Sequence, residues 1–320
     1  MRVHVWSIPM TTRFRGITVR EGVLIETTTS GGGAGWGEFS PFIEYDDDVA
    51  APWLASAHEA ARGDWPAPLR SAVPVNVTVP AVGPEQAHRI VLASAGCRTA
   101  KVKVADPGET LAEAQARLEA VRDALGPDGR IRIDVNGLWS VDEALAGIPV
   151  LDRSAGGLEY VEQPCMAVED LALVRRRVDV PIAADESIRR AVDPYRVREL
   201  EAADVAVLKV QPLGGVRACL RIAEDIGLPV VVSSALESSV GLAAGVALAA
   251  ALPELHYACG LATGALLAED VVMQPLSVVD GMLPVVRPSV DPSALARATA
   301  SPERTAWWQD RVRRVSGLLD

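Results

Sequence analysis

Three lysines stand out among the residues whose chemistry could support a reaction. Of the 31 basic residues only Lys101, Lys103 and Lys209 are lysine, and the other 28 are arginine. Arginine stays protonated at any ordinary pH, whereas a lysine that is desolvated or placed beside other cations can lose its proton and act as a base. Because the chain keeps lysine only in two strand-like runs, we predict that these residues serve catalysis.

Three acidic residues accompany the lysines in a regular pattern. Asp134, Glu162 and Asp185 stand at the ends of three consecutive β-branched runs. Carboxylates brought together in a protein raise one another's pKa unless a cation neutralises them. Oxygen ligands favour a hard ion, so we expect Mg²⁺ here, with Mn²⁺ as the alternative. The four histidines are scattered and no HExxH motif occurs, which argues against zinc.

Eight short β-branched runs would position these side chains. They recur about 20 to 30 residues apart, and stretches with helical periodicity, such as 110–125 and 216–226, lie between them. This βαβα alternation favours an α/β fold of the TIM-barrel type over an open doubly wound sheet. The runs cover residues 75–79, 100–104, 130–135, 158–162, 181–185, 205–210, 229–234 and 257–261, the last being the weakest.

The alternation of side chains along a strand predicts how the lysines approach a ligand. Lys101 and Lys103 share one face of the second strand, and Lys209 ends the sixth. The second and sixth strands of an eight-stranded barrel lie opposite each other, so the lysines would face one another across it. The acids lie at the C-terminal ends of the strands between them, where barrel enzymes build their active sites. A divalent ion there would offset the charge formed when a lysine removes a proton beside a carboxylate.

The two ends of the chain have other patterns. Residues 1–74 contain apparent strands at 3–8 and 22–28, a glycine-rich turn at 31–33 and a helix-like stretch at 53–62, which predicts a small α+β domain. The barrel would occupy residues 75–284. The tail, 285–320, contains a helix-like stretch from 294 to 319 that could pack on either domain.

Composition excludes several classes of protein. The net charge of -11 and the pI near 5.0 disfavour binding to nucleic acid. The longest apolar run, 240–252, is too short to span a membrane and indicates a buried helix. The first residues do not resemble a secretory signal, and the four cysteines form no CxxC pair or disulfide pattern. We therefore expect a cytoplasmic protein that acts on a small molecule and requires no protein partner.

A family resemblance rests on five motifs that contain these residues: KVK (101–103), DVN (134–136), EQP (162–164), DES (185–187) and KVQPLGG (209–215). The series resembles the muconate-cycloisomerase-type branch of the enolase superfamily over nearly the whole chain. The resemblance implies a (β/α)7β barrel under an α+β capping domain, which the N-terminal part and the returning C-terminal tail would form together.

Three further stretches are similar to the o-succinylbenzoate synthases of this branch: GWGEFSPFIEYDD (35–47), SSALESSVG (233–241) and GLATGALL (260–267). Those enzymes are lyases of menaquinone biosynthesis. They dehydrate 2-succinyl-6-hydroxy-2,4-cyclohexadiene-1-carboxylate to 2-succinylbenzoate. The resemblance implies the same metal-dependent reaction here.

The resemblance also assigns roles to individual residues. Lys103 would be the base that removes the α-proton and then the acid that assists loss of hydroxide. Lys209 would stabilise the intermediate from the other face without transferring a proton, and Lys101 would tune Lys103. The implied metal ligands are Asp134, Glu162 and Asp185, the implied supporting residues are Asn136 and Glu186, and the family positions that line the substrate pocket are Ser233, Leu236 and Gly260.

Other candidate contacts come from strand periodicity and from the cap. Arg132 lies two residues before Asp134 on the same strand face, where it could meet a substrate anion or form a structural salt bridge. The segments 13–16 and 39–45 are candidate lids over the site. Their aromatic residues Phe14 and Phe39 stand out in a chain with few aromatics, although packing within the cap would explain them equally well.

Several other activities would use the same residues. An N-acylamino acid racemase or a dipeptide epimerase would employ Lys103 and Lys209 on opposite faces of one carbon. The Asp-x-Asp typical of dipeptide epimerases is replaced by Gly-Leu-Ala-Thr-Gly at 260–264, which weakens that alternative. Muconate cycloisomerase, a Schiff-base aldolase and a non-catalytic barrel are further alternatives.

Overall fold

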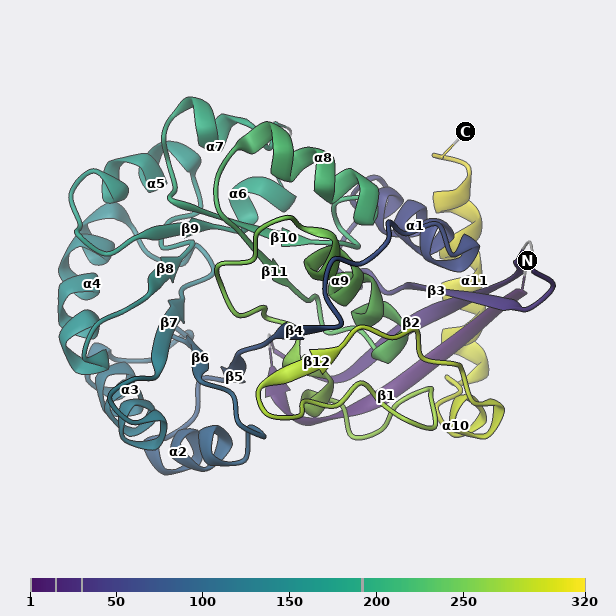
Figure 1. Ribbon diagram of the computed structural model, residues 1–320, viewed down its shortest axis with the longest axis horizontal. Helices are drawn as coiled ribbons and strands as arrows, with labels where there is room; N and C mark the ends of the chain where they lie inside the picture. Colours follow the sequence, from purple (N-terminus) through teal and green to yellow (C-terminus); the bar gives the residue numbers. More distant parts are fainter. Residues whose placement is uncertain (1, 15, 30, 191–192, 320) are drawn as a thin grey trace.

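The computed structural model describes residues 2–14, 16–29, 31–190 and 193–319, and it contains a parallel barrel beside an antiparallel sheet (Figure 1). The barrel strands form one sheet of seven in the order β11-β10-β9-β8-β7-β6-β5. These strands are β5 (Val77–Val79), β6 (Thr99–Lys103), β7 (Arg130–Asp134), β8 (Tyr160–Glu162), β9 (Ile182–Ala184), β10 (Val205–Lys209) and β11 (Val230–Ser233). The predicted barrel-type α/β fold is confirmed.

The eighth predicted run closes the barrel without forming a strand. Within the described residues, 257–261 make only isolated parallel bridges, from Cys259 to Val75 and from Gly260 to Ser233. The second contact depends on glycine, because a Cβ at Gly260 would lie 2.6 Å from Ser233 Oγ. Cys259 N donates to the carbonyl of Pro74 and Gly260 N donates to the carbonyl of Val232, so this short segment joins the two edges of the sheet. The prediction of a strand at 257–261 was therefore wrong, although its position in the barrel was right.

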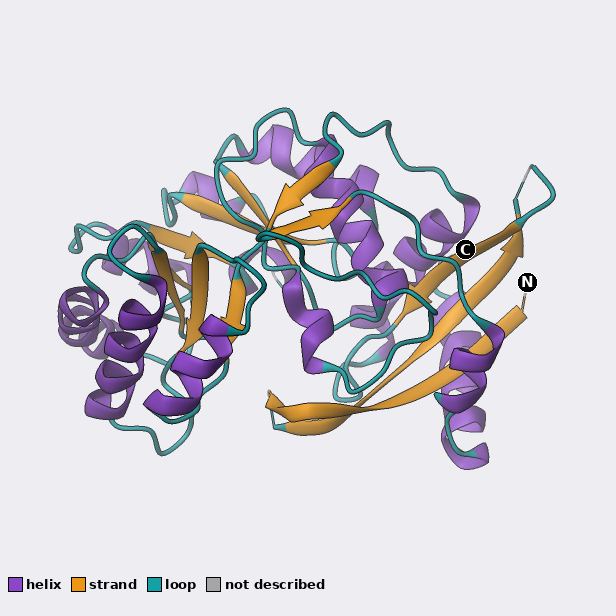
Figure 2. Ribbon diagram, turned by 60° about the horizontal axis from the view of Figure 1, so that its bottom comes forward, coloured by secondary structure: helices purple, strands orange, loops and turns teal. Residues whose placement is uncertain are grey.

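Helices surround the parallel strands on the outside (Figure 2). Two of them begin in capping boxes, in which Thr110 pairs with Glu113 and Ser140 pairs with Glu143. Among the described residues, no helix combines the length and the apolar character needed to cross a membrane. The helices are α2 (Pro84–Leu92), α3 (Leu111–Leu125), α4 (Val141–Ala155), α5 (Val168–Arg175), α6 (Glu186–Arg189), α7 (Arg196–Glu199), α8 (Val216–Ile226) and α9 (Ser239–Ala251), with the 3-10 turn η1 at Ala262–Leu266.

The N-terminal sheet consists of β1 (Arg2–Phe14), β2 (Ile17–Thr28) and β3 (Ala34–Phe39), all antiparallel. Helix α1 (Asp47–Arg62) lies close against this sheet, because Gly35 and Gly37 leave room for its backbone. A Cβ at either glycine would come within 1.9 Å of a carbonyl oxygen of α1. The predicted α+β unit therefore forms, with longer strands and an earlier helix start than the sequence indicated.

The C-terminal tail returns to this N-terminal unit. Residues 294–319 were expected to be one helix, but the chain forms α10 (Pro292–Arg297) and α11 (Pro302–Ser316). The break is caused by Ser301, whose side chain accepts a hydrogen bond from Arg304 N and starts a new helix. Helix α11 inserts the buried Trp308 beside Phe39, with ring centroids 6.0 Å apart. The domain boundaries at residues 74 and 284 stay a prediction.

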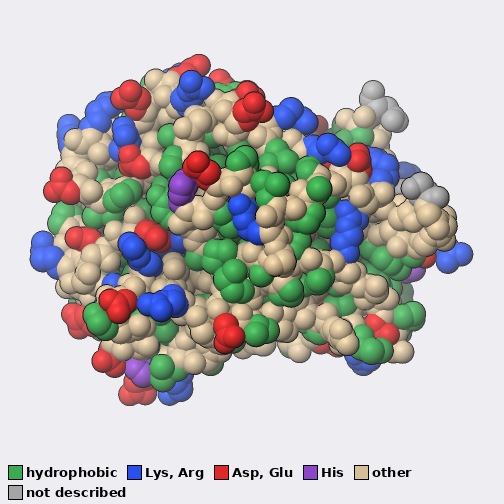
Figure 3. Space-filling view, viewed as in Figure 1, with side chains coloured by type: hydrophobic (Ala, Val, Ile, Leu, Met, Phe, Trp, Pro, Cys, Tyr) green, Lys and Arg blue, Asp and Glu red, His purple; other side chains and the backbone are tan. Residues whose placement is uncertain are grey.

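Two short strands, β4 (Ala72–Pro74) and β12 (Met282–Pro284), pair antiparallel where the chain enters and leaves the barrel. On the face shown in Figure 3, acidic and basic side chains are interspersed over the barrel helices.

Candidate active site

The first group of functional side chains gathers where β6, β7 and β8 end. Strand register pairs Lys103 with Asp134 and Asp134 with Glu162, so these residues lie at one level of the barrel. Lys101 Nζ lies 2.9 Å from Glu162 Oε1 and 3.1 Å from Asp134 Oδ2. Lys103 Nζ donates to Asp134 Oδ2 and to Asn136 Oδ1, each at 2.6 Å. Side chains from three neighbouring strands are therefore joined by hydrogen bonds and ion pairs into one group.

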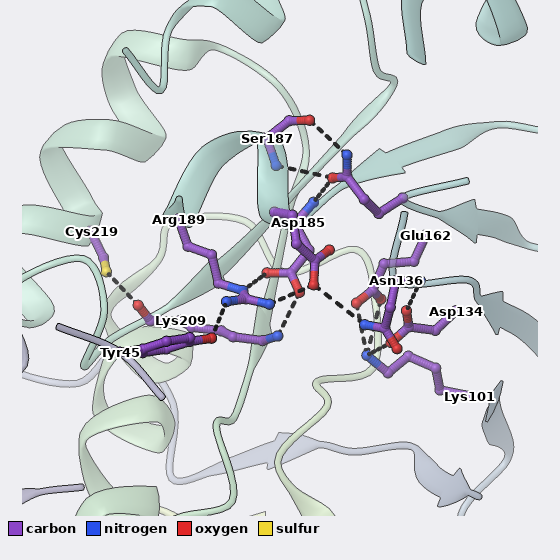
Figure 4. A network of polar contacts seen from close by, with 12 residues as sticks. Tyr45, Lys101, Asp134, Asn136, Glu162, Asp185, Ser187, Arg189, Lys209 and Cys219 are labelled. Atoms are coloured by element: carbon purple, nitrogen blue, oxygen red, sulfur yellow. Dashed lines mark hydrogen bonds and ion pairs between the residues drawn. The ribbon is translucent and has the colours of Figure 1, made fainter. Parts of the chain in front are cut away.

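The second group lies at the ends of β9 and β10. Lys209 Nζ lies 2.6 Å from Asp185 Oδ2, and Arg189 Nε lies 2.8 Å from Asp185 Oδ1. Burial opposes ionisation of Asp185, but Arg189 and Lys209 outweigh burial and lower its pKa. Arg189 Nη1 also donates to the Tyr45 hydroxyl at 3.2 Å. In Figure 4, Lys101 and Lys209 reach the carboxylates from opposite sides, which is the arrangement that opposite strands of a barrel predict.

Burial and neighbouring charges shift the pKa values of the two lysines and the two acids of the first group in different directions. Burial opposes ionisation of Asp134, but Lys103 and Lys101 outweigh it and hold its pKa below the usual range. Burial and the neighbouring Asp134 raise the pKa of Glu162 to about 7 despite Lys101. Burial lowers the pKa of Lys103, and the positive charge of Lys101 adds to that shift against the attraction of Asp134. Burial also opposes the charge of Lys101, but Glu162 and Asp134 prevail and raise its pKa.

The acids Asp134, Glu162 and Asp185 offer only oxygen ligands, which suits a hard divalent cation. Each of these acids is paired with a lysine. Among the described residues, no three His, Cys, Asp or Glu side chains are grouped closely enough to hold a metal ion. Two observations still fit a cation. Burial, together with the neighbouring Asp134, raises the pKa of Glu162, and a cation bound there would favour the ionised carboxylate. In the described part of the chain, nothing donates a hydrogen bond to the buried Glu186 Oε2, whereas Oε1 accepts from Asn136 Nδ2 at 3.4 Å.

A narrow cavity lies between the two groups. Its free volume is about 30 Å³, which is space for about two water molecules, so a substrate enters only if the surrounding side chains move apart. Phe14, from the candidate lid at 13–16, lines it and places its ring centroid 5.5 Å from Lys103 Nζ. Residue 15 of that segment lies outside the described residues. The predicted site residues in the lining are Lys101, Lys103, Asp134, Asn136, Lys209, Ser233, Leu236 and Gly260.

Five residues named from the sequence are not in the lining. Glu162, Asp185 and Glu186 contact lining residues from behind them. Phe39 and Arg132 lie further from the cavity. Phe39 is fully buried against Trp308, and Phe42 from the same 39–45 segment lines the cavity instead. Arg132 pairs in register with Lys101, one level nearer the N-terminal end of the barrel than Asp134. Lys101 at that level lines the cavity, whereas Arg132 does not.

Arg132 instead forms a buried structural cluster at that lower level. Its guanidinium binds the Glu159 carboxylate and the Ala258 carbonyl and lies 4.7 Å from the ring centroid of Tyr160. The side chain of Arg132 is wholly buried, whereas 14% of the Glu159 side chain is exposed. The salt-bridge alternative raised for Arg132 is the one that the structure contains.

This cluster gives a stability prediction. Replacing Glu159 with alanine leaves the Arg132 charge buried without its carboxylate, so we expect the free energy of unfolding to fall by about 3–5 kcal/mol. Urea denaturation measures this change, and Glu159→Gln, which keeps an acceptor oxygen, should lose less. A change below about 1 kcal/mol in Glu159→Ala would show that the pair behaves as an ordinary surface ion pair.

Several residues of the site were missed by the sequence analysis. Gln163 Oε1 accepts hydrogen bonds from the backbone N–H groups of Asp185 and Ser187, at 2.9 and 3.1 Å, and so orients the start of α6. Arg189 holds Asp185 from four residues further along that helix. The EQP motif and the helical spacing were the available signals. The other missed lining residues are Phe42, Thr78, Ser234, Ala235 and Thr263.

Comparisons with known proteins agree with the geometry. The family described as Enolase N-terminal domain-like matches residues 5–61, and the family described as Enolase C-terminal domain-like matches residues 84–289. The o-succinylbenzoate synthase of Thermobifida fusca (strain YX) is 65% identical over 312 residues, which cover 98% of this chain and 95% of that protein. The o-succinylbenzoate synthase of Mycolicibacterium smegmatis is 54% identical over 318 residues, covering 99% and 96%.

A solved structure provides a comparison of folds. The dipeptide epimerase from Enterococcus faecalis V583, complexed with Mg and the dipeptide L-Leu-L-Tyr, superposes with a TM-score of 0.77. Its sequence is 22% identical, and the match covers 92% of this chain and 97% of that one. At this level of identity the likeness concerns the fold, a barrel with its capping domain.

Proposed function

The chain belongs to the o-succinylbenzoate synthase family of the enolase superfamily, and from this premise we propose how its residues dehydrate 2-succinyl-6-hydroxy-2,4-cyclohexadiene-1-carboxylate. One observation carries the proposal: Lys103 and Lys209, from β6 and β10, line a single cavity together with Lys101 and Asp134, and each of the two is paired with a carboxylate. The reaction is a carbon–oxygen elimination that yields 2-succinylbenzoate and water.

Lys103 is the base in this proposal. Its lowered pKa, which burial and the neighbouring Lys101 produce, makes the neutral amine more accessible than in a lysine on the surface. The amine takes the proton from the ring carbon that bears the carboxylate, and the electron pair of the broken C–H bond is delocalised onto the carboxylate as an enediolate. This pair forms the ring double bond as the C–O bond to the hydroxyl group breaks, and Lys103 gives its proton to the departing hydroxide to form water.

Lys209 supplies a fixed positive charge on the other side of the ring. Its amine is held by Asp185, which Arg189 also holds, so its position is defined before substrate arrives. The positive charge of Lys209 stabilises the negative charge that develops during proton removal. As the ring becomes aromatic, the ammonium group facing it also gains a cation–π attraction. No proton transfer is assigned to Lys209.

Asp134, Glu162 and Asp185 would hold the divalent cation, for which we propose Mg²⁺, with Mn²⁺ as the alternative. When bound, the cation neutralises charge on the substrate carboxylate and so lowers the cost of removing the adjacent proton. Asn136 supports this set because its backbone N–H donates to Asp134 Oδ1 at 3.1 Å. Glu186 supports it through Arg189, which binds both Glu186 and Asp185.

The names of the relatives favour dehydration over racemisation of N-acylamino acids. We propose that the enzyme acts in menaquinone biosynthesis in the cytoplasm, on a small carboxylate and without a protein partner. Proton NMR of parallel incubations with Mg²⁺ tests the choice of reaction. The cyclohexadiene substrate should give the aromatic signals of 2-succinylbenzoate, and an N-succinylamino acid should react more slowly. Faster loss of the amino acid's α-proton signal in D₂O would instead identify a racemase.

A further inference from the structure

One wall of the substrate cavity is a strained turn. Residues 233–236 line the cavity and connect β11 with α9. Leu236, in this turn, has φ +65°, a left-handed conformation that residues other than glycine adopt rarely. Glu237 closes the turn from within, because its Oε2 accepts from Ala235 N at 2.7 Å. A turn of this kind keeps its shape only if the surrounding structure holds it.

Glu38, at the end of β3 in the N-terminal sheet, holds the chain just beyond this turn. Its Oε1 accepts hydrogen bonds from Ser40 Oγ at 2.7 Å and from Ser238 N at 3.3 Å. Its Oε2 accepts from Ser238 Oγ and from Gly241 N, the latter at 3.1 Å. The carboxylate is almost wholly buried, and a Cβ at Gly241 would lie 2.9 Å from Glu38 Cδ. Glu38 therefore lies directly against the first turn of α9.

Arg20, on the neighbouring strand β2, holds the turn itself. Its Nε donates to the carbonyl of Leu236 at 3.1 Å, and its Nη2 donates to the carbonyl of Ala235 at 3.2 Å. Nη2 also binds the carbonyl of Ser40, which ties the guanidinium to the end of β3. The sheet therefore binds carbonyl groups of the cavity wall through Arg20 and binds N–H groups just beyond the wall through Glu38.

A second buried carboxylate makes an otherwise similar contact away from the cavity. Glu59 of α1 accepts from Val216 N at 2.6 Å and from Arg217 N at 3.0 Å, at the start of α8. A Cβ at Gly215 would lie 2.5 Å from Glu59 Oε2. Glu59 thus fastens the N-terminal unit to the barrel as Glu38 does, but the start of α8 does not line the cavity.

We propose that Glu38 is a positioning residue for substrate binding, which fixes the cavity wall at 233–236 through Ser238 and Gly241, whereas Glu59 serves stability alone. This inference rests on the proposed function for its kinetic consequence. All four groups that bind the Glu38 carboxylate are donors, so the amide nitrogen of a glutamine would face a donor. Glu38→Gln changes little in size and therefore tests the hydrogen bonds without opening a cavity.

The kinetic test compares Glu38→Gln with the matched control Glu59→Gln. Burial and the nearby Glu237 raise the pKa of Glu38 to about 7, so assays at pH 8 keep the wild-type carboxylate ionised. In Glu38→Gln we expect KM for the cyclohexadiene carboxylate to rise about tenfold while kcat changes less than about threefold, because binding common to ground and transition states is lost. Glu59→Gln should keep the wild-type KM. A wild-type KM in Glu38→Gln, or an equal rise in both variants, would overturn the proposal.

A second measurement needs no substrate. Amide hydrogen exchange followed by mass spectrometry should show faster exchange of residues 234–241 in Glu38→Gln than in the wild type, and unchanged exchange there in Glu59→Gln. Equal protection of this segment in all three proteins would contradict the positioning role. If the wild type lacked dehydratase activity, the proposed function would fail, while the exchange comparison would still decide whether Glu38 holds the wall.

Discussion

Replacing Lys103 with alanine is expected to lower kcat for dehydration about a thousandfold or more, because no other group takes the α-proton or returns it to the hydroxide. The substrate should still bind, since the metal ligands and Lys209 remain. Steady-state kinetics with the cyclohexadiene substrate measure the loss. Exchange of the substrate α-proton with deuterium should disappear in the same variant, and exchange that persists there would assign the base to another residue.

Arginine substitutions separate the roles of the two lysines. Lys103→Arg keeps the positive charge but has no proton to give up at ordinary pH, so we expect it to be as inactive as the alanine variant. Lys209→Arg also keeps the charge, and because Lys209 is assigned only an electrostatic role, it should retain more activity than Lys209→Ala. If Lys103→Arg worked nearly as well as the wild type, proton transfer by Lys103 would be ruled out.

The second large effect concerns the acids. Chelation of divalent ions should abolish dehydration, and added Mg²⁺ should restore it, because proton removal beside a carboxylate depends on neutralising the carboxylate charge. In Glu162→Gln, the Mg²⁺ concentration for half-maximal activity should rise about a hundredfold or more, since a direct ligand matters more than its supporting residues. A titration of activity with Mg²⁺ measures this shift.

Glu159→Gln is the matched control for Glu162→Gln, because it also removes an acidic side chain close to β8. Glu159 lies three residues before Glu162, at the lower level of the barrel beside Arg132, and it lines no part of the catalytic cavity. Its variant should keep the wild-type dependence on Mg²⁺. Full activity of the wild type after exhaustive chelation would contradict the assignment of a metal-assisted reaction.

Much of the fold could be predicted because each barrel strand is a short β-branched run between helical stretches. The run at 257–261 misled the prediction, because only Cys259 and Gly260 pair with the neighbouring segments, each through an isolated bridge. The tail was predicted as one helix, because the apolar periodicity continues through a break that Ser301 and Pro302 impose locally. The ends of such helices and strands depend on single side chains, which the spacing of apolar residues does not reveal.

The candidate site was predictable where residue type and strand position agreed. Lysines and acids at strand ends were found because the pleat assigns their face and the chain has few lysines. The alternation of side chains along a strand does not show how far along the barrel axis a residue lies. Arg132 was therefore considered for the pocket, although it lies one level below Asp134. Contacts from the N-terminal unit, such as that of Glu38 with Ser238 just beyond the cavity wall, depend on tertiary packing between distant segments.

The rate of aromatisation by the wild-type enzyme with Mg²⁺, compared with the same solution without enzyme, tests the central assignment most directly. The absorbance of 2-succinylbenzoate should appear with saturation kinetics, at a rate that exceeds the uncatalysed reaction by about a millionfold or more. Formation of 2-succinylbenzoate at the same rate with and without enzyme would contradict the assignment of this chain as a dehydratase.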